Sequence, residues 1–131
     1  MTVTSLLAPA KVTLSLRITG RRADGYHLLD AEMVTVNLFD ELRISDTSGV
    51  TPTSLTVVDE RSGERRVGAL DDLVRRALDV VGRSASVELI KRIPAGAGLG
   101  GGSADAAAVL RWAGCDDLAV AAALGADVPF C

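Results

Sequence analysis

The glycine-rich segment PAGAGLGGGSADAA, residues 94–107, contains the residue types that most directly suggest chemistry. Five glycines lie between positions 96 and 102, and Ser103 follows them. Backbone N–H groups in such a segment can approach an anion closely, because glycine has no side chain and tolerates positive φ. The alanines after Ser103 predict a helix with Ser103 as N-cap, whose dipole and unpaired N–H groups would face the same anion. The segment therefore predicts a phosphate-binding site in preference to a flexible connector.

The loop differs from three familiar phosphate-binding patterns. A Walker A loop needs a lysine before its Ser or Thr, whereas Gly102 precedes Ser103. A GxGxxG match is present, but a dinucleotide site has this motif in its first strand-to-helix turn, and here the loop comes late and after Pro94. A protein-kinase glycine loop lies between two strands, which does not fit a following helix.

Several polar residues have ordinary structural interpretations when they are taken alone. Lys11 opens a predicted strand and is typical of a solvated edge residue, although the chain has only 2 Lys beside 12 Arg. His27 is the only histidine and follows a turn, so it is expected to be exposed. Asp127 lies near Gly125 and Pro129, which is typical of a turn.

The composition indicates one globular domain. The 131 residues are 48% hydrophobic and 24% charged, and with 3% aromatic residues the core must consist of Val, Leu, Ile and Ala. A net charge of −3 argues against a protein that coats nucleic acid, and no apolar run is long enough to span a membrane. Cys115 and Cys131 lack the spacing of a zinc or disulfide framework, so a reducing, cytoplasmic location is expected.

Periodicity predicts strands first and helices afterwards. The N-terminal half alternates apolar and polar residues, and apolar residues from Leu70 to Val81 have helical spacing, with Gly82 as a stop. This order predicts an α+β domain with helices packed on one face of a sheet. The expected strands are 11–19, 27–38, 42–45, 54–58 and 86–93, with a break at 39–41 and a charged loop at 59–66; the expected helices are 70–81, 103–112 and 116–124.

The loop resembles the second motif of the GHMP kinases, the superfamily of galactokinase, homoserine kinase and mevalonate kinase. Its PxxxGLGxS pattern is matched by Pro94, Gly98, Leu99, Gly100 and the 101–103 segment. Three more segments follow the superfamily's order: APAKV at 8–12, ITGRRADGYH at 18–27 and LGADVPF at 124–130. The GLGGGSADAA form is most similar to the branch that phosphorylates 4-diphosphocytidyl-2-C-methyl-D-erythritol in the non-mevalonate isoprenoid pathway.

The resemblance implies roles for the matching residues. Asp127 would be the base that accepts the proton of the substrate hydroxyl, and Lys11 would lie beside both. Tyr26 and His27 would hold the cytosine ring of the substrate, a cytidine diphosphate derivative. ATP would be the phosphoryl donor, with Mg²⁺ expected as in other such transfers. The ATP phosphates would be held by Pro94, Gly96, Gly98, Leu99, Gly100, Gly101, Gly102 and Ser103.

The resemblance also implies a fold and a domain organisation. Residues 1–131 would form the N-terminal, ATP-binding domain, with a mixed sheet of the ribosomal protein S5 domain 2 type. The superfamily's C-terminal domain would be absent, so the chain alone is expected to be inactive. Apolar surface around Val128, Pro129 and Phe130 would then be left bare.

Two departures from the family pattern leave other functions open. Thr13 stands where the family commonly has Asn, and Asp72 stands where an Asn approaches adenine. These departures favour a nucleotide-binding half-domain or degenerate paralogue without transfer activity. A third possibility, an RNA-binding domain of ribosomal protein S5 type, would need a basic face, which a net charge of −3 argues against.

Overall fold

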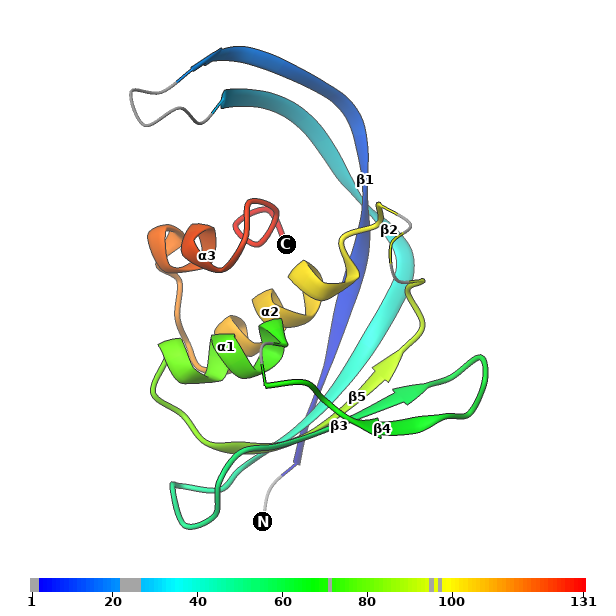
Figure 1. Cartoon of the computed structure of the whole chain (residues 1–131), viewed down its shortest axis with the longest axis vertical. Coiled ribbons are helices and arrows are strands. Elements are labelled where there is room, and N and C mark those ends of the chain that lie inside the picture. Colours follow the sequence, from blue (N-terminus) through cyan, green and yellow to red (C-terminus); the bar gives the residue numbers. More distant parts are fainter. Residues whose placement is uncertain (1–2, 22–26, 71, 95, 97) are drawn as a thin grey trace.

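A five-stranded sheet carries three helices on one of its sides (Figure 1). The computed structural model describes residues 3–21, 27–70, 72–94, 96 and 98–131, with the backbone alone for 15–21 and 27–32. The strand order is β1-β2-β5-β3-β4, and β5 runs antiparallel to β2 and parallel to β3. The predicted α+β class with a mixed sheet is thus confirmed. The elements are β1 (Val3–Arg21), β2 (His27–Asp46), β3 (Ser54–Asp59), β4 (Arg65–Val67), α1 (Leu73–Val80), β5 (Ala85–Lys91), α2 (Gly101–Trp112) and α3 (Leu118–Leu124).

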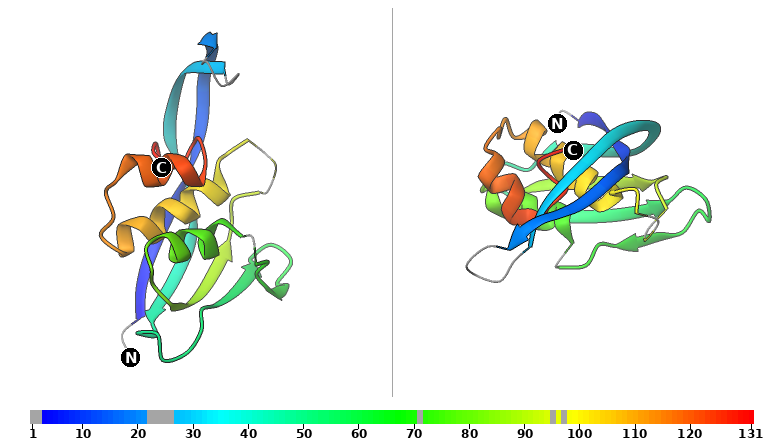
Figure 2. Two further views of the ribbon diagram at one scale, coloured as in Figure 1. Left: turned by 60° about the vertical axis from the view of Figure 1, so that its left-hand side comes forward. Right: turned by 90° about the horizontal axis from the view of Figure 1, so that it is seen from above.

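Strands β1 and β2 form a long antiparallel ribbon that extends past the other three strands and curves over the helix side (Figure 2). The break expected at 39–41 is wrong, because β2 continues through it. Asp40 is fully buried there, and its Oδ1 accepts the N–H groups of Arg92 (2.7 Å) and Ile93 (2.9 Å). A residue type common in turns is tolerated within this strand because the backbone of a neighbouring segment satisfies it.

The charged loop expected at 59–66 contains a hairpin. Asp59 donates its N–H to the carbonyl of Glu64 (2.9 Å), and its Oδ1 accepts the N–H of Arg61 (2.9 Å). The chain then returns as β4, which pairs with β3. The three residues of β4 are all exposed, so this edge strand has no buried face and no alternating pattern to reveal it.

Helix α1 begins later, and helix α2 begins earlier, than the sequence predicts. Helix α1 starts after Asp72, whose Oδ1 accepts the N–H of Val74 (2.8 Å), and Leu70 lies outside it. The prediction of Ser103 as N-cap of α2 is wrong: the N-cap is Gly100, in the left-handed conformation with φ 69°. Ser103 is the third residue of α2, because the glycine turn is tight enough to start the helix two residues earlier.

The core is aliphatic, as the composition predicts. Its buried members are all Ala, Val, Leu or Ile, and the alanines of α2 let this helix lie close to the sheet. Trp112 is partly buried at the edge of the core, with the Arg83 guanidinium 4.4 Å from its ring centroid. Val128 is buried, so the expectation that it leaves apolar surface bare is wrong, whereas Phe130 is 42% exposed. No helix in the described part of the chain combines the length and apolar character needed to span a membrane.

Candidate active site

The connection from β5 to α2 surrounds a cavity of about 450 Å³. All eight residues predicted to hold phosphates line it, from Pro94 to Ser103. Gly96, Gly98 and Gly100 have φ between 69° and 74°, the left-handed region that side chains disfavour. The remaining lining residues are Val57, Arg66, Asp72, Leu73, Leu89, Lys91 and Asp105.

The first turn of α2 faces this cavity, and no side chain of the described residues caps its backbone N–H groups. Its N-cap Gly100 has no side chain that could accept them, and Gly101, Gly102 and Ser103 all line the cavity. The first N–H groups of a helix have no partner within the helix, and the helix dipole makes this end positive. Together with the glycine turn, this end of α2 is suited to an anion the size of a phosphate group.

Lys11 and Asp127 meet beside the glycine loop, although 115 residues separate them in the sequence. Lys11 Nζ lies 3.2 Å from Asp127 Oδ2, and it donates a hydrogen bond to Thr13 Oγ1 (3.0 Å). The lysine side chain is 8% exposed and the aspartate side chain 33% exposed. A buried ammonium group therefore holds a carboxylate that solvent, and so a substrate, can reach.

A β-bulge connects Lys11 to the loop. The pairing of β1 with β2 shifts between Pro9 and Lys11, and the N–H of Lys11 donates to the carbonyl of Leu99 (2.8 Å). The lysine stem then passes Gly100 so closely that a Cβ there would lie 2.8 Å from Lys11 Cε and 2.9 Å from Cγ. Bulges redirect side chains next to active sites, and here the redirected residue is Lys11.

Asp127 lies in a turn after α3. Its carbonyl accepts the N–H groups of Phe130 (3.1 Å) and Cys131 (3.2 Å), and the neighbouring Val128 is buried. This turn contacts α2, because Arg111 of α2 donates a hydrogen bond to the carbonyl of Cys131 (2.8 Å). The buried valine thus fixes the segment that presents the carboxylate to Lys11.

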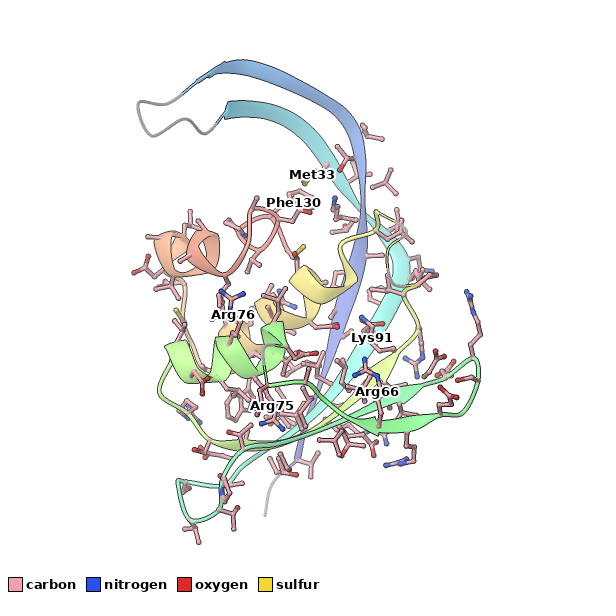
Figure 3. The ribbon with its side chains drawn as sticks, in the orientation of Figure 1. Met33, Arg66, Arg75, Arg76, Lys91 and Phe130 are labelled. Carbon is pink, nitrogen blue, oxygen red and sulfur yellow. The ribbon has the colours of Figure 1, made fainter. Side chains whose placement is uncertain are left out.

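A second lysine cluster lies on the other side of the loop, and sequence reasoning missed it. Lys91 Nζ contacts Asp40 Oδ2 (2.6 Å) and Asp105 Oδ2 (2.9 Å), and it lies 3.1 Å from where a Cβ would stand at Gly101. Figure 3 shows Lys91 and Arg66, which project from β5 and β4 toward the same cavity. Two signals were available in the sequence: Lys91 is one of only two lysines, and Asp105 is the only charged residue in an alanine stripe.

Burial and neighbouring charges shift the pKa values in this second cluster. Burial raises the pKa of the Asp105 carboxyl to about 9, with Asp40 adding to the shift and Lys91 opposing it. Burial by itself would lower the pKa of Lys91, but the two aspartates outweigh it and raise that pKa. Lys91 thus stays positively charged while Asp105 holds its proton at neutral pH.

The structure shows what Thr13 and Asp72, the two residues that depart from the family pattern, contact. Thr13 accepts a hydrogen bond from Lys11, so it supplies a polar contact to the lysine. Asp72 lines the cavity, but its Oδ1 is engaged as the N-cap of α1. Tyr26 lies outside the described residues; His27 begins β2, and its side chain is not described.

Within the described ranges, no group of three or more His, Cys, Asp or Glu side chains is arranged to hold a metal ion. Magnesium in phosphoryl-transfer sites is commonly bound through substrate phosphates, water and one or two carboxylates. No dedicated protein cage for such an ion is present among those residues.

Comparison with known proteins places this geometry in a family. The model of the GHMP kinases N terminal domain matches residues 67–131. The 4-diphosphocytidyl-2-C-methyl-D-erythritol kinase of Ruegeria pomeroyi is 42% identical over 132 residues, which cover 95% of this chain and 46% of that protein. The enzyme of the same name from Paracoccus denitrificans is 45% identical, and the match covers 95% of this chain and 43% of that enzyme. The chain therefore spans about half the length of the curated relatives it matches.

Solved structures agree with the sequence matches. The crystal structure of a 4-(cytidine 5'-diphospho)-2C-methyl-D-erythritol kinase matches 97% of this chain and 48% of its own, with a TM-score of 0.70 and 38% identity. The mevalonate kinase of Methanococcus jannaschii matches 94% of this chain and 46% of its own, with a TM-score of 0.56 and 12% identity, and so shares the fold. This chain belongs to the GHMP kinases: it is a GHMP kinase N-terminal domain, homologous to the N-terminal half of 4-diphosphocytidyl-2-C-methyl-D-erythritol kinases.

Proposed function

We propose that this chain is the ATP-binding and catalytic N-terminal part of a kinase that phosphorylates the 2-hydroxyl group of 4-diphosphocytidyl-2-C-methyl-D-erythritol. The observation that carries the proposal is the 3.2 Å contact of Lys11 with Asp127 beside the glycine loop. A reachable carboxylate, a fixed positive charge and a phosphate-sized anion site are the three parts that phosphoryl transfer to an alcohol requires. The names of the relatives support the choice of substrate.

The proposed reaction uses the site as follows. Backbone N–H groups of the glycine loop and of the α2 N-terminus hold the phosphates of ATP. Asp127 accepts the proton of the 2-hydroxyl group as its oxygen bonds to the γ-phosphorus. The bond from the γ-phosphorus to the β–γ bridging oxygen breaks, and ADP leaves with that electron pair. Lys11 orients Asp127 and stabilises the charge on the transferring group. When bound with the nucleotide, Mg²⁺ neutralises phosphate charge.

The proposal extends to the rest of the substrate and to domain organisation. Tyr26 and His27 hold the cytosine ring, and residues 1–131 act as the N-terminal domain in a cytoplasmic enzyme. The matched relatives are about twice as long as this chain, and in the proposal a second domain completes the cleft. Positioning and exclusion of water both depend on a closed cleft, so the chain alone binds ATP weakly and turns over negligibly.

The test compares two proteins in an ATP-dependent assay with 4-diphosphocytidyl-2-C-methyl-D-erythritol as acceptor. One is the 131-residue chain, and the other is this chain joined to the remaining C-terminal residues of the Ruegeria pomeroyi relative. Turnover by the joined protein and almost none by the chain is the expected result. Nucleotide binding by the joined protein without any phosphorylated product would instead identify a binding domain without transfer activity.

A further inference from the structure

Arg66 of β4 directs its side chain to the side of the sheet that carries the helices (Figure 3). It is in register with Val57 of β3, which is buried, and both residues line the cavity of the candidate site. The preceding Arg65 lies on the other face, because successive side chains of a strand alternate. There its Nη2 contacts Glu88 Oε2 at 3.0 Å. The two adjacent arginines therefore serve opposite faces of the sheet.

The guanidinium group of Arg66 is available to a ligand, whereas other charged groups of this cavity are engaged. Lys91 and Asp105 contact each other at 2.9 Å, and Asp72 Oδ1 accepts the N–H of Val74. Among the described residues, the Arg66 side chain forms no ion pair and no hydrogen bond. It lines this cavity and an adjoining one of about 410 Å³. A ligand can therefore bind Arg66 without displacing a protein partner from it.

Arg66 lies at some distance from the groups suited to phosphate. The glycine loop and the first turn of α2 follow β5, and β3 lies between β5 and β4. Because neighbouring strands are about 4.8 Å apart, the backbone of Arg66 is about 10 Å from β5. Val57 of β3 and Leu89 of β5 pair in register across this interval, and both are buried and line the cavity. These two residues form an apolar floor between Arg66 and the phosphate site.

This arrangement suits a ligand with an anionic end and a flat, apolar end. Phosphate groups at the glycine loop leave the apolar floor and Arg66 to the rest of the molecule. A guanidinium group is planar, permanently charged and weakly hydrated, so it stacks well on aromatic rings. Leu73 of α1 also lines the cavity and adds to its apolar surface. A nucleotide has both ends, because its ribose separates an aromatic base from the phosphate groups.

We infer that Arg66 stacks its guanidinium group on the base of the bound nucleotide and holds that base on the apolar floor. The inference rests on the proposed function for the nucleotide itself, and it adds a binding residue that lies outside all four motif segments. Arg66 acts on the base, and the glycine loop acts on the phosphate groups. ADP and inorganic pyrophosphate separate the two contacts, because pyrophosphate has phosphate groups and no base.

The first measurement is a pair of titrations of the ¹⁵N-labelled full chain with these two ligands, followed through the backbone amide signals in NMR spectra. We expect pyrophosphate to shift the signals of residues 101–103 and to leave those of β4 unchanged. ADP should shift both groups of signals, because its base reaches β4. ADP binding that leaves the β4 signals in place would overturn the inference.

The second measurement is the affinity of arginine variants for the same ligands at 0.15 M salt. Arg66→Lys keeps the charge and removes the planar group, so its affinity for ADP should fall about three- to tenfold. Its affinity for pyrophosphate should stay within about twofold, because the charge is kept and salt screens it at this distance. Arg65→Lys is the matched control, since it makes the same substitution one residue away on the opposite face. It should leave both affinities unchanged.

The outcomes separate this inference from the proposed function. If Arg66→Lys binds ADP as tightly as the unchanged chain, Arg66 does not stack on the base. If Arg66→Ala weakens ADP and pyrophosphate by the same factor and Arg66→Lys restores both, the residue acts as a charge on the phosphate groups, and the stacking contact is refuted. In both cases the phosphate site of the proposed function stands. If neither ligand shifts the signals of residues 101–103, the proposed function fails and the inference falls with it.

Discussion

The two lysines of the chain lie against neighbouring glycines, and their surroundings differ. Lys11 passes over Gly100 and holds Asp127, a carboxylate whose side chain is 33% exposed. Lys91 lies against Gly101 and holds two carboxyl groups that are almost completely buried. In the proposed reaction Asp127 exchanges a proton with the substrate, whereas the two carboxyl groups at Lys91 have almost no contact with solvent. The same pairing of residue types thus suits one site to chemistry and the other to support of the loop.

The largest expected effect comes from removal of the exposed carboxylate. Asp127→Asn should lower turnover of the protein joined to the relative's C-terminal residues by roughly 10²–10⁴-fold, the usual contribution of a general base. ADP affinity should change by less than about twofold, because the variant removes a base and hardly any volume. Steady-state assays and calorimetric titration measure the two quantities.

Asp116→Asn is the matched control for this variant, because Asp116 is an exposed aspartate in the same part of the chain. It should leave both turnover and affinity unchanged. If Asp127→Asn retained most of its rate, Asp127 would be structural and the proposed mechanism would be wrong.

The second largest effect should appear in stability. Asp40→Ala leaves Lys91 with one partner and leaves the N–H groups of Arg92 and Ile93 without an acceptor. Removal of one partner from a buried ion pair costs roughly 3–5 kcal/mol. The equivalent change at the other lysine, Asp127→Ala, should cost less, because the Asp127 side chain is 33% exposed and Lys11 keeps its hydrogen bond to Thr13. Urea denaturation of the two variants gives the difference, and equal losses would contradict the distinction between the two clusters.

The glycines between the clusters should show a smaller effect. Gly100→Ala must hold an alanine at φ 69° and bring its Cβ within 3 Å of the Lys11 side chain. Gly114→Ala has a similar φ of 72° with nothing within 4 Å, so it reports the conformational cost alone, about 1–2 kcal/mol. We expect Gly100→Ala to be the less stable variant and the only one with lower ADP affinity. Equal stability of the two would show that the lysine stem moves aside without cost.

The last expected effect is a change in the pH dependence of stability. The pKa of Asp105 is raised in the folded chain to about 9, so the folded chain holds one proton more than the unfolded chain between about pH 4 and pH 9. The contribution of Asp105 to stability therefore decreases as the pH rises through this window, by at most about 1.4 kcal/mol per pH unit. The free energy of unfolding of the unchanged chain, relative to Asp105→Asn, should fall between pH 5 and pH 9. A constant difference would mean that Asp105 ionises normally.

The local sequence pattern was sufficient to predict those parts of the fold in which buried and exposed residues alternate along the chain. The strand before residue 20, helix α1 and the strand–glycine loop–helix connection were all predicted, because each has a clear apolar period or a run of glycines. Two expectations were wrong for different reasons. The edge strand β4 has no buried face, so no alternating pattern reveals it. The break expected at 39–41 does not form because Asp40 has partners 51 to 53 positions away in the sequence.

The same distinction applies to the candidate site. The glycine loop was predicted from its own residues, whereas Lys11 and Asp127 were linked to it only through motif resemblance, since neither spacing nor composition links positions so far apart. The Asp40–Lys91–Asp105 cluster has no motif of its own and depends on three elements that meet only in the folded chain. Its only signs in the sequence were the scarcity of lysine and a lone carboxylate in an alanine stripe.

The hydrogen bond from the Lys11 N–H to the Leu99 carbonyl joins the strand that bears the lysine to the loop that lines the cavity. A loop that shifts by a few tenths of an ångström around an anion must carry this peptide group with it. Occupancy of the cavity and the position of the Lys11 ammonium group are therefore thermodynamically linked. By thermodynamic reciprocity, a ligand bound at Lys11 and Asp127 changes the affinity of the cavity for its anion by a certain factor. The anion in the cavity changes the affinity for the ligand at Lys11 and Asp127 by the same factor. In the proposed kinase, two ligands bound at these two places would then show cooperativity, transmitted in part by one main-chain hydrogen bond.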